Sequence, residues 1–179
     1  MTDVSARNFG ILIAYIIPGF AVVATISPDV PIIRFWLGGS SVGTPTIGGF
    51  LYVTLASVAF GMVVSAVRWL LLDFVHHHTG IRRPEWDFSL LQRNRAAVLT
   101  LVEQHYRYYQ FFGNSLIATL LAATRPASLH AFLPTSPPVA LVVIVLLLIL
   151  LFVASRDALQ KYYLRTTALL GEDRPTRPK

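Results

Sequence analysis

Cysteine is absent from this chain of 179 residues, and charged residues are scarce. The missing cysteines exclude disulfides, thiolate metal sites and cysteine nucleophiles. Only 13% of the residues are charged, whereas a soluble domain usually has about 25%. This deficit indicates a chain whose surroundings are largely lipid.

Long apolar blocks take the place of the missing charge. Hydrophobic residues make up 54% of the chain and its mean hydropathy is +0.59. The blocks are long enough to cross about 30 Å of hydrocarbon as helices. We therefore expect an all-α, integral membrane four-helix protein and a single membrane domain over 1–179. Its expected spans are 9–27, 50–72, 107–124 and 139–155.

The first span leaves one alternative open. A short polar start before an apolar run is also typical of a cleaved signal peptide. Pro18 and Gly19 interrupt the middle of the run, and a proline there permits a kink in a membrane helix. We interpret the segment as a span with a packing kink.

The polar parts of the chain predict two cytosolic extensions. The segment 73–106 is expected to lie in the cytosol, and Ser89 and Gln92 have the spacing of a capping box that opens a helix. No proline follows until Pro126, so helix three is expected to run about 34 residues, longer than a bilayer is thick. Helix four is expected to continue over 156–171, before a disordered tail over 172–179.

Orientation follows from the placement of the 15 Lys and Arg residues. With four spans, all of them except Arg34 and Arg125 fall on the side of the termini. Because basic residues accumulate in cytoplasmic segments, both termini are predicted to be cytoplasmic. The expected location is a bacterial inner (cytoplasmic) membrane.

Two sets of small or polar residues are candidates for the lining of a pore. On the second span Ser57, Gly61 and Ser65 repeat every four residues, which suits either close helix packing or a water-filled path. On helix three Thr100, Glu103, Arg107, Gln110 and Asn114 form a polar stripe, within which Glu103 and Arg107 have the spacing of an ion pair. The candidates for pore lining are Glu103, Gln110, Asn114, Ser57, Gly61 and Ser65.

Arginines and tyrosines of the cytosolic segment are candidates for binding an anionic aromatic ligand. Arginines neutralise phosphate and aromatic rings stack on bases. The open alternative is an interfacial aromatic belt with basic residues that meet anionic lipid head groups. The candidates are Arg82, Arg83, Arg93, Arg95, Arg107, Tyr106 and Tyr109.

Enzyme and metal signatures are not found. The sequence has no Gly-rich phosphate loop, H-E-x-x-H or G-x-S-x-G motif, so no catalytic residue is predicted. The triplet His76 to His78 with Asp73 has a spacing compatible with a metal ion. No second cluster supports it, so neither a metal nor a cofactor is expected.

Two functions from different classes fit these features. The first is a homo-oligomeric channel or pore-type effector, because four spans enclose a conduit only when several copies assemble. A nucleotide or oligonucleotide on its basic cytosolic face would regulate it. The second is a non-conducting scaffold for a soluble partner. The expected partners are the lipid bilayer, further copies of the chain, the nucleotide-type ligand and a soluble partner enzyme.

The overall plan of four spans, a compact basic cytosolic face and no catalytic site resembles the small multi-pass membrane effectors of bacterial anti-phage defence systems, for example the Hailong type. The resemblance implies gating by a nucleotide-type ligand made by a partner enzyme, with membrane depolarisation as the output. It covers the plan alone and no motif, so no functional residues carry over.

Overall fold

The computed structural model describes residues 2–38, 46–125 and 136–171, and all regular structure in these ranges is helical. The expected all-α class is confirmed. A 3₁₀ turn, η1 (Phe88–Leu90), and a π-helical turn, η2 (Val102–Tyr106), precede and follow α4. The α-helices are α1 (Thr2–Ile26), α2 (Pro31–Trp36), α3 (Ile47–His78), α4 (Leu91–Leu101), α5 (Arg107–Ala123) and α7 (Pro137–Leu170).

Two of these helices, α3 and α7, are long and apolar enough to cross a membrane. They have 32 and 34 residues, or about 48 and 51 Å at 1.5 Å per residue. Only 22% of the most apolar stretch of each is buried inside the chain, as expected for helices that face lipid. A shorter apolar stretch, Leu12–Ile26, lies in α1. The count of four spans and the side on which each terminus lies stay predictions.

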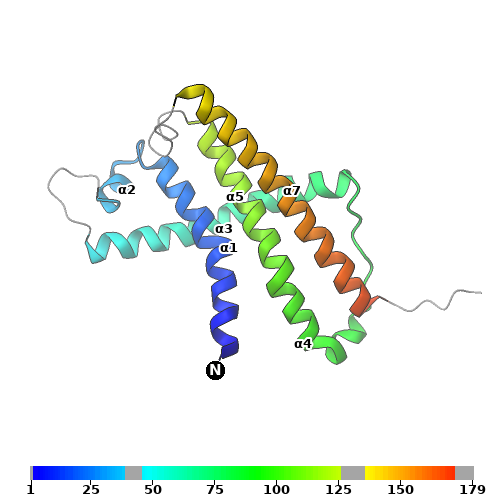
Figure 1. Cartoon of the computed structure of the whole chain (residues 1–179). Helices are drawn as coiled ribbons and strands as arrows, with labels where there is room; N and C mark the ends of the chain where they lie inside the picture. Colours follow the sequence, from blue (N-terminus) through cyan, green and yellow to red (C-terminus); the bar gives the residue numbers. More distant parts are fainter. Residues whose placement is uncertain (1, 39–45, 126–135, 172–179) are drawn as a thin grey trace, which may run out of the picture.

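The long helices do not form a simple parallel array. In Figure 1, α5 and α7 run side by side, and α3 crosses α1 and α5 at a steep angle. α1 packs against both α3 and α5, so it covers the face on which these two helices meet. α4 continues the direction of α5 beyond η2 and packs against the C-terminal half of α7.

Small residues bring α1 and α3 into backbone contact. A Cβ added to Gly19 would lie 1.8 Å from the carbonyl oxygen of Ser57, and one added to Gly61 would lie 2.2 Å from the carbonyl oxygen of Tyr15. Small residues permit this approach between membrane helices. The helix α1 is continuous through Pro18, which is buried.

The predicted capping box is wrong. Asp87, not Ser89, supplies the cap, because its Oδ1 accepts a hydrogen bond of 2.8 Å from the backbone N–H of Ser89. The chain enters the helix through the 3₁₀ turn η1, so the first unpaired amides belong to that turn. Leu90, the residue before α4, makes no side-chain cap.

The long third helix exists but contains a π turn, and this removes the predicted ion pair between Glu103 and Arg107. In η2 the backbone N–H of Arg107 bonds to the carbonyl oxygen of Val102, five residues earlier. The wider turn shifts the register, so residues four apart no longer share a face. Arg107 donates to Gln110 Oε1 over 2.9 Å, and no ion pair joins it to Glu103.

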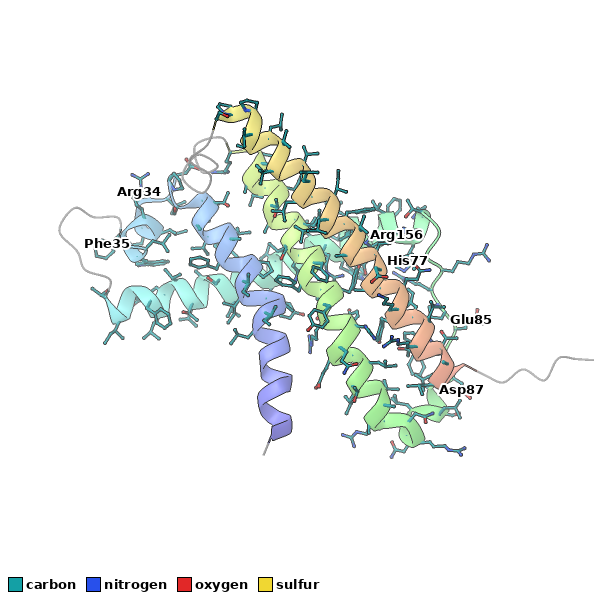
Figure 2. The ribbon with its side chains drawn as sticks, viewed as in Figure 1. Arg34, Phe35, His77, Glu85, Asp87 and Arg156 are labelled. Carbon is teal, nitrogen blue, oxygen red and sulfur yellow. The ribbon has the colours of Figure 1, made fainter. Side chains whose placement is uncertain are left out.

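The segment between α3 and α4 returns along α7 and caps its end. The backbone N–H of Asp87 donates to the carbonyl oxygen of Leu170 over 2.8 Å, and Asn94 Nδ2 donates to that of Leu169 over 2.9 Å. These bonds satisfy carbonyl groups of the last turn, which lack partners within the helix. Figure 2 shows Glu85 and Asp87 along this returning segment, beside α7.

The predicted extension of helix four is confirmed, since α7 is continuous to Leu170. The first residues of the expected cytosolic segment, up to His78, continue the helix α3, and their cytosolic placement stays a prediction. The expected tail over 172–179 lies outside the described residues.

Candidate functional site

A buried ion pair lies at the contact between α3 and α5. Arg68 Nη1 is 2.9 Å from Asp73 Oδ1, and the two side chains are 3% and 15% exposed. The Tyr109 hydroxyl donates to the same carboxylate oxygen. The Arg68 guanidinium lies over the Tyr109 ring, 4.7 Å from its centre. The charges of this pair are therefore matched inside the fold, as buried charges require.

Gly113 provides the space for the ion pair. A Cβ added there would lie 2.6 Å from Arg68 Cδ and 3.0 Å from Leu72 Cδ2. Sequence reasoning missed this pairing, because Arg68 and Asp73 are five residues apart and do not have the usual spacing of helical ion pairs. Two opposite charges at the end of an apolar run were the only signal.

The histidine triplet separates into three different environments. His76 is fully buried, and its Nε2 lies 3.0 Å from Ser155 Oγ on α7. His77 is half-buried and its Nε2 lies 3.1 Å from the Tyr163 hydroxyl, while His78 is exposed. Within the described ranges, no group of three His, Asp or Glu side chains has the arrangement of a metal site.

The polar residues on α5 face α1. Gln110 is 5% exposed and its Nε2 donates to the Tyr15 hydroxyl over 3.0 Å. Asn114 is fully buried and its Nδ2 donates to the carbonyl oxygen of Ala14 over 2.8 Å. Asn114 Oδ1 has no hydrogen-bond partner among the described residues. Glu103, further along the stripe, is half-buried.

The small residues on α3 meet the same helix. Ser57 is 1% exposed, Gly61 is buried and Ser65 is half-buried. The contacts of Gly61 and Ser57 with the backbone of α1 agree with the interpretation of helix packing. Within one chain, α1 therefore covers Ser57, Gly61, Gln110 and Asn114, and their role as pore lining stays a prediction.

The seven residues predicted to bind an anionic ligand do not form one surface. Arg82 and Arg83 lie in the segment after α3, whereas Arg93 and Arg95 are exposed on α4. Arg107 is half-buried and lies against α1, where a Cβ added to Gly10 would be 3.4 Å from Arg107 Cγ.

The two predicted stacking tyrosines belong to an aromatic cluster inside the chain. Tyr109 is 1% exposed, and Tyr106 is half-buried with its ring centre 5.1 Å from that of Tyr162 on α7. Trp86 lies at the edge of the Tyr162 and Tyr163 rings, at 5.8 and 6.0 Å. These positions do not favour stacking on a ligand, because the rings already hold η2 and the returning segment against α7.

His105 and Arg165 form a further contact between η2 and α7. Arg165 Nη1 lies 2.6 Å from His105 Nε2, so the neutral imidazole accepts the hydrogen bond. Partial burial and the positive charges of Arg165 and Lys161 lower the pKa of His105. The side chain is therefore a structural contact at neutral pH and adds nothing to the positive charge of this region.

An open hollow of about 480 Å³ lies where α3 ends. One part of its lining comes from α3, with Trp69, Leu70, Phe74, His77 and His78. The other part comes from the returning segment, with Ile81, Arg82 and Arg83. Two of the predicted ligand-binding arginines thus lie beside exposed apolar side chains of a candidate membrane helix.

Comparison with known proteins gives no relatives. The chain matches no protein-family model, and no curated protein or solved structure is similar to it.

Proposed function

We propose that the chain is a multi-pass membrane protein of the channel or pore-effector class that acts as a homo-oligomer. In this proposal α1, α3, α5 and α7 all span the membrane, with both termini in the cytoplasm. The buried polar groups of α5 belong to the conduction path, and the basic residues of the cytosolic side receive an anionic, nucleotide-type ligand.

One observation carries the proposal: polar groups continue into the contact between α1, α3 and α5. Gln110 and Asn114 on α5 are buried in this contact. The ion pair of Arg68 and Asp73, near the end of α3, adds two charged groups to it. Polar and charged side chains are costly at membrane depth and commonly mark ion or substrate pathways. Asn114 Oδ1 also keeps an unused acceptor in this region.

The helix α1 gives this path a closed state. Gln110 and Asn114 donate hydrogen bonds to Tyr15 and to the backbone of Ala14. Such bonds between membrane helices contribute only about 0.6 kcal/mol each on average. The exchange of these two bonds for water would therefore cost little, and a movement of α1 away from α5 would uncover the polar side of α5.

A second candidate function is a non-conducting scaffold for a soluble partner. It is favoured by the same hydrogen bonds, which give both side-chain amides partners inside a single chain. In that case the polar stripe holds α1 to α5, and the exposed arginines of α4 face a partner protein.

Conductance of the purified full chain in planar bilayers separates the two functions. We expect discrete currents that change when cyclic nucleotides or short oligonucleotides are added on the cytosolic side. Asn114→Leu is expected to abolish the currents and to leave oligomers intact, because it removes a polar group but only one weak interhelical bond.

Thr124→Ala is the matched control, since Thr124 is exposed just after α5 and bonds only locally, to the carbonyl oxygen of Leu121. It should conduct like the unchanged chain. Correctly inserted oligomers that conduct nothing under any of these ligands would favour the scaffold. Equal loss of oligomers and current in Asn114→Leu would assign the stripe to assembly.

A further inference from the structure

The hollow at the end of α3 is built by a fixed turn. Gly80 has a φ of 107°, a backbone conformation that glycine adopts without strain. Arg156 on α7 donates to both the hydroxyl and the carbonyl oxygen of Thr79, each over 2.7 Å. Ile81 is 6% exposed and packs in a core cluster with Tyr109 and Leu159. The segment that carries Arg82 and Arg83 is therefore anchored on both sides of the turn.

The lining of the hollow combines exposed apolar side chains with basic ones. Trp69, Leu70 and Phe74 are 59%, 61% and 60% exposed, and all three lie on a helix long and apolar enough to cross a membrane. Arg82 and Arg83 belong to the part of the lining that the returning segment supplies. At the boundary between hydrocarbon and head groups, a membrane helix typically carries a tryptophan that is followed by basic residues.

Within the described ranges, no acidic side chain neutralises the positive charge of the hollow. No carboxylate of the described residues lies within ion-pair distance of Arg82 or Arg83. Arg83 Nε donates to His77 Nε2 over 3.4 Å, which orients the guanidinium and leaves its terminal nitrogens unused among the described residues. Guanidinium groups bind phosphate through paired, charge-assisted hydrogen bonds.

We propose that this hollow binds one anionic phospholipid, with its phosphate on Arg82 and Arg83 and an acyl chain along Trp69, Leu70 and Phe74. The occupant is a lipid and not a soluble nucleotide, because a soluble anion would leave the three apolar side chains uncovered. Basic residues beside a membrane favour anionic lipids, by about 1 kcal/mol each. The inference rests on the membrane placement proposed above, but it holds whether or not the chain conducts.

Fluorescence quenching of Trp69 by brominated lipids tests the site. The full chain carrying Trp36→Phe and Trp86→Phe keeps Trp69 as its one tryptophan, because the sequence has three. It is reconstituted in vesicles of phosphatidylcholine with either brominated phosphatidylglycerol or brominated phosphatidylcholine. We expect stronger quenching by the anionic lipid, and Arg82→Ala with Arg83→Ala should lower that preference about thirtyfold.

The control is Arg93→Ala with Arg95→Ala, which removes the same charge from exposed positions on α4. This pair should leave the preference for phosphatidylglycerol unchanged. An equal loss in both double variants would overturn the proposal, because it would show a diffuse attraction to the charged surface. Displacement of the lipid by soluble glycerol phosphate would also overturn it, in favour of a free-phosphate site.

The same measurement separates the lipid site from membrane insertion. If both brominated lipids quench Trp69 equally, the helix is inserted but the hollow has no preference for anionic lipid, and the site is wrong. If neither lipid quenches Trp69, the membrane placement itself is wrong. Circular dichroism of each variant, with helix content equal to that of the unchanged chain, shows that a lost preference is not a loss of fold.

Discussion

At the scale of single residues, the ion pair of Arg68 and Asp73 requires close pairing inside the fold. Two charges taken out of water cost several kcal/mol each unless they are closely paired and hydrogen-bonded. The Tyr109 hydroxyl and ring supply the additional partners. Gly113 leaves the space in which Arg68 lies, so four residues from two helices depend on one another.

We predict that Asp73→Ala destabilises the protein by about 3 kcal/mol or more, because it leaves the buried Arg68 without a counter-charge. The free energy of unfolding in a denaturing-detergent titration measures this loss. Asp157→Ala is the control, since Asp157 pairs with Lys161 at the surface, where the side chains are 57% and 51% exposed. That change should stay within about 0.5 kcal/mol. Comparable losses in both variants would contradict a special role for the buried pair.

At the scale of helices, the crossing of α1 and α3 determines how closely the chain packs. The nearest atoms to Gly19 and Gly61 are backbone atoms of the opposite helix. Backbone atoms do not move aside as a flexible side chain does. The crossing therefore tolerates no added methyl group, in contrast to Gly113, whose nearest atoms belong to side chains.

We predict that Gly61→Ala pushes α1 away from α3. The free energy of unfolding should fall by about 1–3 kcal/mol, and the midpoint of thermal unfolding should fall with it. The variant is measured by circular dichroism in detergent micelles. Gly48→Ala, on the same helix, is the matched control, because nothing lies within 4 Å of a Cβ added there. Its midpoint should be unchanged or slightly higher, since alanine favours helix more than glycine does. An unchanged midpoint for Gly61→Ala would show that the helices do not meet in this way.

At the scale of the whole molecule, the exposed apolar side chains fit the lipid environment that we propose. Both α3 and α7 present large apolar residues outward along their length, and contiguous exposed apolar surface of this kind marks a membrane or protein interaction site. The basic segment after α3 and the end of α7 lie together, because the returning segment bonds to the last turn of α7. The two ends must therefore lie on the same side of any membrane.

The absence of cysteine makes this topology directly testable. We predict that Glu85→Cys reacts with a membrane-impermeant maleimide only in inside-out vesicles, because the distribution of basic residues predicts that its segment is cytoplasmic. Asp29→Cys, in the connector after α1, should react only in right-side-out vesicles or intact spheroplasts. Labelling of both cysteines from one side would contradict the four-span arrangement.

Sequence alone determined the helical class, the two longest apolar helices and the continuation of α7 beyond its most apolar part. These follow from composition and periodicity, which act locally along the chain. The polar stripe of α5 was also visible in the sequence, but its partners were not. The pattern shows that Gln110 and Asn114 share a face, whereas only packing shows that this face meets α1.

Tertiary structure decided which residues lie together. The predicted ligand-binding set was divided among the hollow, α4 and the contact with α1, because the returning segment and the π turn change both direction and register. The ion pair of Arg68 and Asp73 and the aromatic contacts of Tyr106 and Tyr109 with α7 also emerged only from the fold. The hydrogen bond from Asn114 to Ala14 joins residues 100 positions apart, and the energy of burial and pairing that selects such contacts has no local signature in the sequence.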